Sequence, residues 1–414
     1  MSIQPADVRP SHSTTGFILT IVAIALAMAA STASSPFYPQ IQDALHLDIV
    51  QITLVFAVYP AGLLATLLVA GSLCDHLGRR PVAFAGLLML AVSLALFAWG
   101  DSLGILLVAR ILQGIATALV VATVSTYMAE LAPPALAGHV ALANAAGPAA
   151  GLAIGAVFGG IMLDLASPAL TPTFSVMIVL IVVIAALVWL LPEVALRRPG
   201  VVGSLLPRLR VPRAAAPTLL RVTPAIIASW GTGGLFISLG AHIAAEVFEA
   251  QSHTLQGATV GILAASATAA TIALWRWSSR TLLIIGALAL AAGTLASIVA
   301  VLTASALGYF AIIVVIGVGF GLSYAGSLRL VLPHVAREDR AGLFSVIYVI
   351  AYLSFSVPAV IAGALISLIG LIPAIIGYGV LVSAFALVAL VALLVQRPGA
   401  ARAQDAPEPS RVVG

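Results

Sequence analysis

The feature that most constrains this chain is a long series of apolar stretches separated by short polar breaks. A helix needs about 20 apolar residues to cross a hydrocarbon layer of roughly 30 Å. Twelve stretches meet that length, at about 17–38, 51–73, 81–100, 103–128, 139–163, 171–191, 223–248, 256–275, 281–303, 306–332, 342–369 and 371–395. The sequence therefore predicts an all-α integral membrane protein with twelve transmembrane helices.

The composition excludes several other classes of protein. Of the 414 residues, 62% are hydrophobic and 8% are charged, whereas a soluble domain has roughly 25% charged residues. The net charge of +4 comes entirely from arginine, and these arginines do not cluster as a phosphate-binding patch would. We therefore expect no nucleic-acid partner. The single cysteine, Cys74, excludes an intrachain disulfide and a Cys-rich metal centre, and we expect no metal site.

The middle of the chain is different from both halves. Residues 192–221 hold five prolines and six arginines, which predicts a cytoplasmic linker. An N-terminal bundle of six helices at 17–191 precedes it, and a C-terminal bundle of six helices at 222–395 follows. Six spans on each side suggest an internal duplication. The polar segments 1–16 and 396–414 are expected to be cytoplasmic tails.

The distribution of arginine predicts the orientation in the membrane. With the N-terminus inside, every arginine except Arg110 lies in a cytoplasmic segment. The outside loops contain acidic residues such as Asp101 and Asp164 but no arginine. This distribution satisfies the positive-inside rule. We expect a protein of the cytoplasmic (inner) membrane, embedded in its lipid bilayer, with both termini in the cytoplasm.

The loop between the second and third spans carries the most specific motif. It reads GSLCDHLGRRP over residues 71–81 and resembles the signature G-x-L-a-D-r-x-G-R-R of the major facilitator superfamily. The matching positions are Gly71, Asp75, Gly78, Arg79 and Arg80. The alternative is a basic cytoplasmic turn without a special role. The corresponding loop of the second half, residues 276–280, keeps arginines but has no aspartate.

The resemblance implies two pseudo-symmetric six-helix bundles that rock about a central site. It also implies that the Asp75 loop engages the eleventh helix, which begins near Gly342, and thereby latches the outward-facing state. No cofactor is implied, because the proton gradient supplies the energy. We expect a functional monomer with a small-molecule substrate.

A second motif lies in the fourth span, where Arg110 to Gly114 is similar to the family's R-x-x-Q-G sequence. Arg110, Gln113 and Thr117 share one face of that helix. An arginine within a span must face a cavity or a partner rather than lipid. Either Arg110 lines the central cavity, where it binds an anion or tunes proton coupling, or it is a structural residue satisfied by backbone carbonyls.

Small residues recur in the fifth and eighth spans. Gly147, Pro148 and Gly151 match part of the antiporter motif G-x-x-x-G-P-x-x-G-G, although its first and last glycines are missing here. Gly155 continues the row. Close helix packing is the alternative explanation. We expect this face to pack against a complementary strip at Gly257 and Gly261 in the eighth span, on the outer side.

Three further sets of residues are candidates for the transport site. His242 and Glu246, four residues apart in the seventh span, are possible proton carriers, or a solvated surface pair. Asn144 stands near the start of the fifth span as a candidate substrate or coupling residue. Aromatic rings within spans could stack on an amphipathic ligand or serve only for packing; they are Tyr59, Trp230, Tyr324, Tyr348 and Tyr352.

These observations favour a secondary transporter rather than an enzyme. The expected activity is export of a small amphipathic or anionic molecule in exchange for protons, by alternating access. Uptake of a metabolite by proton symport is the alternative. A membrane-embedded enzyme or a channel is a remote alternative, because intramembrane charges are scarce and no repeated filter segment is present.

Overall fold

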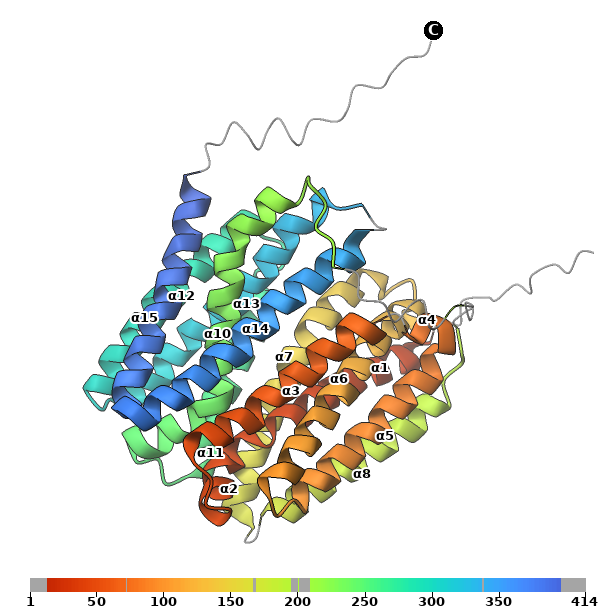
Figure 1. Ribbon diagram of the computed structural model, residues 1–414. Helices are drawn as coiled ribbons and strands as arrows, with labels where there is room; N and C mark the ends of the chain where they lie inside the picture. The colour runs from red at the N-terminus through yellow and green to blue at the C-terminus, as the bar shows by residue number, and fades with distance from the viewer. Residues whose placement is uncertain are drawn as a thin grey trace, which may run out of the picture.

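The computed structural model describes residues 13–71, 73–166, 169–194, 200, 209–336 and 339–395. Nearly all of the expected tails, residues 195–199 and 201–208 of the expected linker, and Arg337 lie outside these residues. Within them, twelve helices are long and apolar enough to cross a membrane, which confirms the predicted fold class. Figure 1 shows the first six, red to yellow, beside the last six, green to blue.

The helices follow the chain in a simple order. The first half contains α1 (Thr14–Thr32), α2 (Tyr38–Ala44), α3 (Ile49–Ala70), α4 (Leu73–Leu77), α5 (Arg79–Ala98), α6 (Leu103–Leu131), α7 (Val140–Leu165) and α8 (Leu170–Trp189). The second half contains α10 (Ala216–Phe248), α11 (His253–Ala273), α12 (Ser279–Leu302), α13 (Ala306–Val331), α14 (Arg340–Ile369) and α15 (Leu371–Leu394). Three single 3-10 turns lie at Ser35–Phe37, Ala137–His139 and Leu332–His334.

Two helix boundaries differ from the sequence prediction. Helix α1 ends at Thr32, and a 3-10 turn and α2 continue the first span. Pro36 and Pro39 explain the break, because each lacks the N–H that a continuous helix would use. Helix α10 begins at Ala216 instead of near 223, with a proline in its first turn. Proline is favoured there, so the linker ends earlier than its expected boundary at 221.

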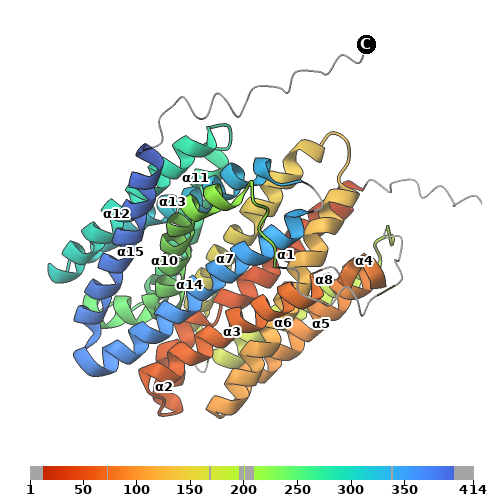
Figure 2. The same ribbon diagram turned by 45° about the horizontal axis from the view of Figure 1, so that its top comes forward.

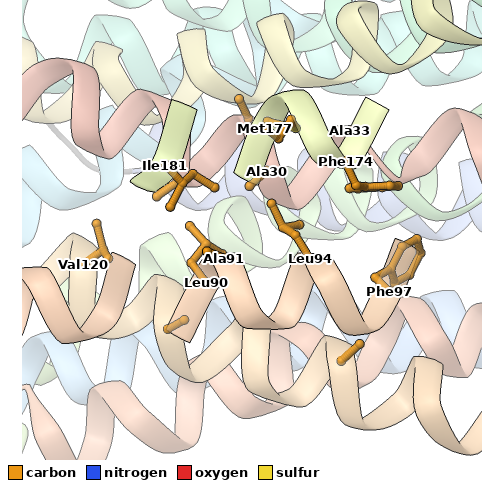
Figure 3. Close-up of a cluster of buried hydrophobic side chains, with 14 of the residues drawn as sticks. Ala30, Ala33, Leu90, Ala91, Leu94, Phe97, Val120, Phe174, Met177 and Ile181 are labelled. Atoms are coloured by element: carbon orange, nitrogen blue, oxygen red, sulfur yellow. The ribbon is translucent and has the colours of Figure 1, made fainter. Parts of the chain in front are cut away.

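An apolar interface holds α5 and α8 together within the first bundle. Figure 3 shows Leu94 and Phe97 of α5 pointing toward Phe174 and Met177 of α8. The rings of Phe97 and Phe174 lie 5.2 Å apart between centroids, in an edge-to-face arrangement that aromatic pairs favour. All four side chains are buried. This interface lies away from the second bundle and serves as scaffold.

The two sides of the membrane domain can be named from the chain itself. The start of α1, the 71–81 loop and the end of α15 lie on one side, here called the termini side. The end of α7 and the first turn of α11 lie on the opposite side, here called the far side (Figures 1 and 2). All hydrogen bonds between the two bundles that the structure describes lie toward the far side. They join Ser35 to Ile237, Gln42 to His242, Gln40 to His253, and Asp164 to residues 252–254.

Candidate transport site

The 71–81 loop forms a charged cluster on the termini side. Gly78 adopts a φ of +104°, which glycine tolerates far better than other residues, and α5 starts directly after it. Arg79 is 7% exposed and pairs with Asp75 and with Glu130, whose carboxylate lies 3.0 Å from its guanidinium. Glu193 accepts the backbone N–H groups of Arg79 and Arg80 at 2.9 and 3.0 Å. The carboxylate thereby caps the N-terminus of α5.

Other members of the motif complete this cluster. The guanidinium of Arg80 lies 4.7 Å from the ring centre of Trp189, a cation–π distance. Gly71 ends α3, where a Cβ would meet the carbonyl oxygen of Leu67. Cys74 lies buried against Arg79, and burial raises the pKa of its thiol. The thiol is therefore neutral at physiological pH.

Asp75 meets a different partner from the one that the resemblance implied. It pairs with Arg79 of its own bundle, whereas Gly342 at the start of α14 packs against Arg210. The described hydrogen bonds between the bundles lie toward the far side. The 71–81 loop is on the termini side, where fewer such bonds hold the bundles together. A latch to α14 in the opposite conformation stays a prediction.

Arg110 is enclosed within the first bundle and is 1% exposed. Its guanidinium donates to the carbonyl oxygens of Val55 and Ser31 at 3.3 and 3.2 Å, and to the hydroxyl of Tyr38 at 2.9 Å. It also donates to Ser34 and Gln113. All of these acceptors are neutral, and they satisfy the donors of the side chain. These contacts are those of the structural alternative considered above, and a role of Arg110 in binding or coupling stays a prediction.

The side chains predicted to accompany Arg110 extend this network only in part. Gln113 donates to the carbonyl oxygen of Ala30 at 2.9 Å and so ties α6 to α1. Thr117, fully buried, lies beside the phenol of Tyr59, over whose ring Arg110 sits at 4.9 Å. Asn144 lies apart from this network, where its amide approaches the Ser125 carbonyl at 3.5 Å.

The five aromatic residues named from the sequence form one continuous cluster between the bundles, here called the aromatic cluster. Trp230 of α10 contacts Tyr324 and Tyr352 with ring centres 5.3 and 4.8 Å apart. Tyr348 lies 6.2 Å from Tyr352, and Tyr352 packs against Tyr59 of the first bundle. The cluster therefore joins α10, α13 and α14 to α3.

The polar atoms of the aromatic cluster contrast with those around Arg110. The indole N–H of Trp230 is buried without a hydrogen-bond partner among the described residues. The rings of Trp230, Tyr324, Tyr348 and Tyr352 are each only half-buried. An unpaired buried donor costs free energy, and a ligand with an acceptor atom would remove that cost. The cluster thus combines aromatic surface with an unpaired donor, and these are groups that small-molecule sites use.

His242 and Glu246 do not form the pair that their spacing suggested. His242 is 4% exposed and its Nε2 lies 2.9 Å from the side-chain oxygen of Gln42 in the other bundle. Glu246 is exposed, one turn farther toward the far side. The contact of His242 with Gln42 is therefore one of the links that close the far side.

The glycine rows face two different helices. A Cβ on Gly151 or Gly155 would lie 2.2 and 2.1 Å from backbone oxygens of Ala25 and Ala29 in α1, and Gly147 faces Ile24 there. Gly257 and Gly261 of α11 instead approach Ala156 and Val157 of α7. The fifth and eighth spans therefore pack closely, as expected, but the α7 residues that meet α11 are not the glycines Gly147, Gly151 and Gly155. The row faces α1, and Pro148 lies within the same helix.

Sequence reasoning missed the largest group of described hydrogen bonds between the bundles. Asp164, at the end of α7, accepts hydrogen bonds from the backbone N–H groups of His253 and Thr254 at 2.8 and 2.9 Å. It also accepts from the hydroxyls of Ser252 and Thr254. The first N–H groups of a helix lack partners within it, so Asp164 caps α11 from the other bundle. Only the fold brings the two segments together.

Comparison with known proteins settles the family. The sequence profile of the Major Facilitator Superfamily matches residues 20–357. This chain belongs to the Major Facilitator Superfamily. Family membership indicates a transporter rather than an enzyme.

Solved structures and curated relatives agree with this assignment. The fold is similar to that of a bacterial homologue of the human lysosomal transporter Spinster in an inward-facing, unoccupied conformation, with a TM-score of 0.73 at 15% identity over 94% of this chain and 98% of that chain.

Among curated relatives, the multidrug resistance protein MdtL of Shewanella oneidensis is 39% identical over 77 residues, or 19% of each chain. The facilitated glucose transporter member 6 of solute carrier family 2 from Mus musculus is 34% identical over 109 residues, 25% of this chain and 22% of that protein. The chain thus matches only about a fifth of the length of these relatives.

Proposed function

We propose that this chain exports a small amphipathic molecule across the cytoplasmic membrane in exchange for protons. The termini side, which carries Arg79, Arg80 and the other described arginines outside Arg110, would face the cytoplasm. The far side, closed by contacts between the bundles, would face outward. This is an inward-facing state of an alternating-access cycle, and we propose that a single chain completes the cycle without a cofactor or another protein.

The aromatic cluster carries the proposal for the substrate. Its rings come from both bundles, and it offers the unpaired indole N–H of Trp230 and the phenols of Tyr324, Tyr348 and Tyr352. A flat molecule with apolar faces and an acceptor atom matches this surface. The sequence analysis left two substrate classes open, amphipathic and anionic. The neutral contacts of Arg110 support the amphipathic class.

Resemblance to proteins named for multidrug resistance supports export. Transport in inverted vesicles tests it, with a panel of uncharged aromatic amphiphiles as probes. Acidification of the lumen should drive accumulation of at least one probe by wild-type protein, and the Trp230→Ala variant should reduce it. Accumulation only in right-side-out vesicles with acid outside would instead establish proton symport.

A further inference from the structure

The loop between α11 and α12, residues 274–280, is the counterpart in the second bundle of the loop that carries the signature motif. The backbone N–H of Trp277 donates to the carbonyl oxygen of Leu274 at 2.9 Å and closes a tight turn. Arg280 donates to the carbonyl oxygen of Leu393, at the end of α15, at 3.0 Å. Because α15 ends on the termini side, the 274–280 loop lies on that side too, at the ends of membrane-spanning helices.

Arg329 of α13 packs on this loop. Its guanidinium donates to the carbonyl oxygen of Trp275 at 2.9 Å and lies 5.2 Å from the centre of that indole ring, a cation–π distance. A guanidinium has five N–H donors, and Trp275 is the one hydrogen-bond acceptor that the described residues supply to this one. The remaining donors are therefore left for water or a ligand.

The arginines of this loop lack the carboxylates that balance the loop of the first bundle. There, Arg79 pairs with Asp75 and Glu130. In the part of the chain that the structure describes, no carboxylate forms an ion pair with Arg276 or Arg329. Arg276 is exposed, and an arginine keeps its charge at every physiological pH. The loop therefore presents two unbalanced positive charges.

Exposed apolar side chains accompany these charges. Trp277 is 47% exposed in the loop, and Ile272, in the last turn of α11, is 47% exposed as well. Tryptophan is enriched where membrane helices meet the headgroups of lipids. A soluble anion would match the arginines and leave this apolar surface uncovered. The combination instead matches a molecule with a phosphate at one end and hydrocarbon at the other.

We propose that the 274–280 loop binds an anionic phospholipid, with Arg276 and Arg329 on its phosphate and the ring of Trp277 against the start of its acyl chains. Arginine binds phosphate through paired N–H donors, and basic clusters at the ends of membrane helices attract anionic lipids. Lipid binding at this loop depends on neither the direction nor the substrate of transport. Its failure would therefore leave the proposed function intact.

Native mass spectrometry tests the proposal on the full chain, released from detergent micelles that contain equal amounts of phosphatidylglycerol and phosphatidylcholine. Wild-type protein should retain phosphatidylglycerol in preference to phosphatidylcholine. Arg276→Gln should lower the bound phosphatidylglycerol about fivefold, the attraction of one arginine near an anionic surface. Trp277→Ala should lower it as well. Arg213→Gln, at an exposed arginine before α10 on the same side, is the matched control and should change it little.

Because Arg276 and Trp277 are exposed, both variants should keep the wild-type melting temperature. Equal retention of the two lipids by wild-type protein would overturn the proposal, and so would equal losses in Arg276→Gln and Arg213→Gln. Displacement of the bound phosphatidylglycerol by an excess of inorganic phosphate would show that the loop takes free phosphate instead of a lipid.

Discussion

The Arg110 site of the first bundle and the Trp230 site of the second differ in how completely their polar groups are paired. In the first bundle, Arg110 reaches five neutral acceptors and is closed from its surroundings. In the second, Trp230 has an unpaired N–H and stands among half-buried phenols. The saturated network stabilises its own bundle, whereas the unsaturated one is suited to a ligand. We therefore propose that the intramembrane charge of Arg110 stabilises the first bundle and that the binding surface lies at the aromatic cluster.

Removing the guanidinium is expected to have the largest effect. Arg110→Ala leaves the buried carbonyl oxygens of Val55 and Ser31 and the Tyr38 hydroxyl without their donor, and each orphaned group costs about 1–3 kcal/mol. Transport should be abolished and the melting temperature should fall by several degrees. Arg110→Lys should rescue neither, because an ammonium cannot reach all five acceptors.

Thermal unfolding of the purified variants in detergent checks this prediction. A variant with full stability but no transport would show that Arg110 acts in substrate binding or proton coupling and not in stabilising the fold. It would also remove the contrast between the bundles.

The ion pair of Asp75 in the 71–81 loop should matter more than an exposed ion pair elsewhere on the termini side. Asp75→Asn weakens the pairing with Arg79 and removes the charge implied in the outward-facing latch. Expression should stay near normal, while the transport rate falls by about tenfold or more, since 1.4 kcal/mol corresponds to one decade. Asp339→Asn, which weakens an exposed pair with Arg210 in the second half, is the matched control and should retain most activity.

Trp230→Ala should impair substrate binding without impairing folding. Loss of the indole removes aromatic contact and the unpaired donor, so KM should rise by about tenfold while the melting temperature changes little. Trp230→Phe should recover part of the affinity through the ring alone. Concentration-dependent uptake in vesicles gives both constants. A large fall in stability with an unchanged KM would show that the aromatic cluster serves only for packing.

Tyr348→Phe is expected to have the smallest effect. The phenol hydroxyl makes no hydrogen bond with the described residues, so its loss should not destabilise the protein. KM should change by about two- to fivefold, the value of one weak hydrogen bond to a ligand. The same uptake assay measures it. An unchanged KM would place the ligand closer to Trp230 than to Tyr348.

Apolar length and helix breakers were sufficient to predict the twelve spans, since hydrocarbon thickness fixes the length of a membrane helix. The sequence identified Tyr59 and Trp230 as aromatic residues within spans, but only the fold brings them into one cluster through Tyr352. Helical spacing alone failed for Gly151 and Gly155, because a row of small residues does not say which neighbour fills it. Asp164 was missed for the same reason: its partners lie about 90 residues away in sequence.

The central claim is that the aromatic cluster lies between bundles that open to one side of the membrane at a time. The most direct test is labelling of Tyr348→Cys, in a Cys74→Ala background, with a membrane-impermeant maleimide. The account predicts rapid labelling from the termini side in inverted vesicles and slow labelling in right-side-out vesicles, with Asp164→Asn accelerating the latter. Labelling at equal rates from both sides, or no labelling from either side in both variants, would contradict it.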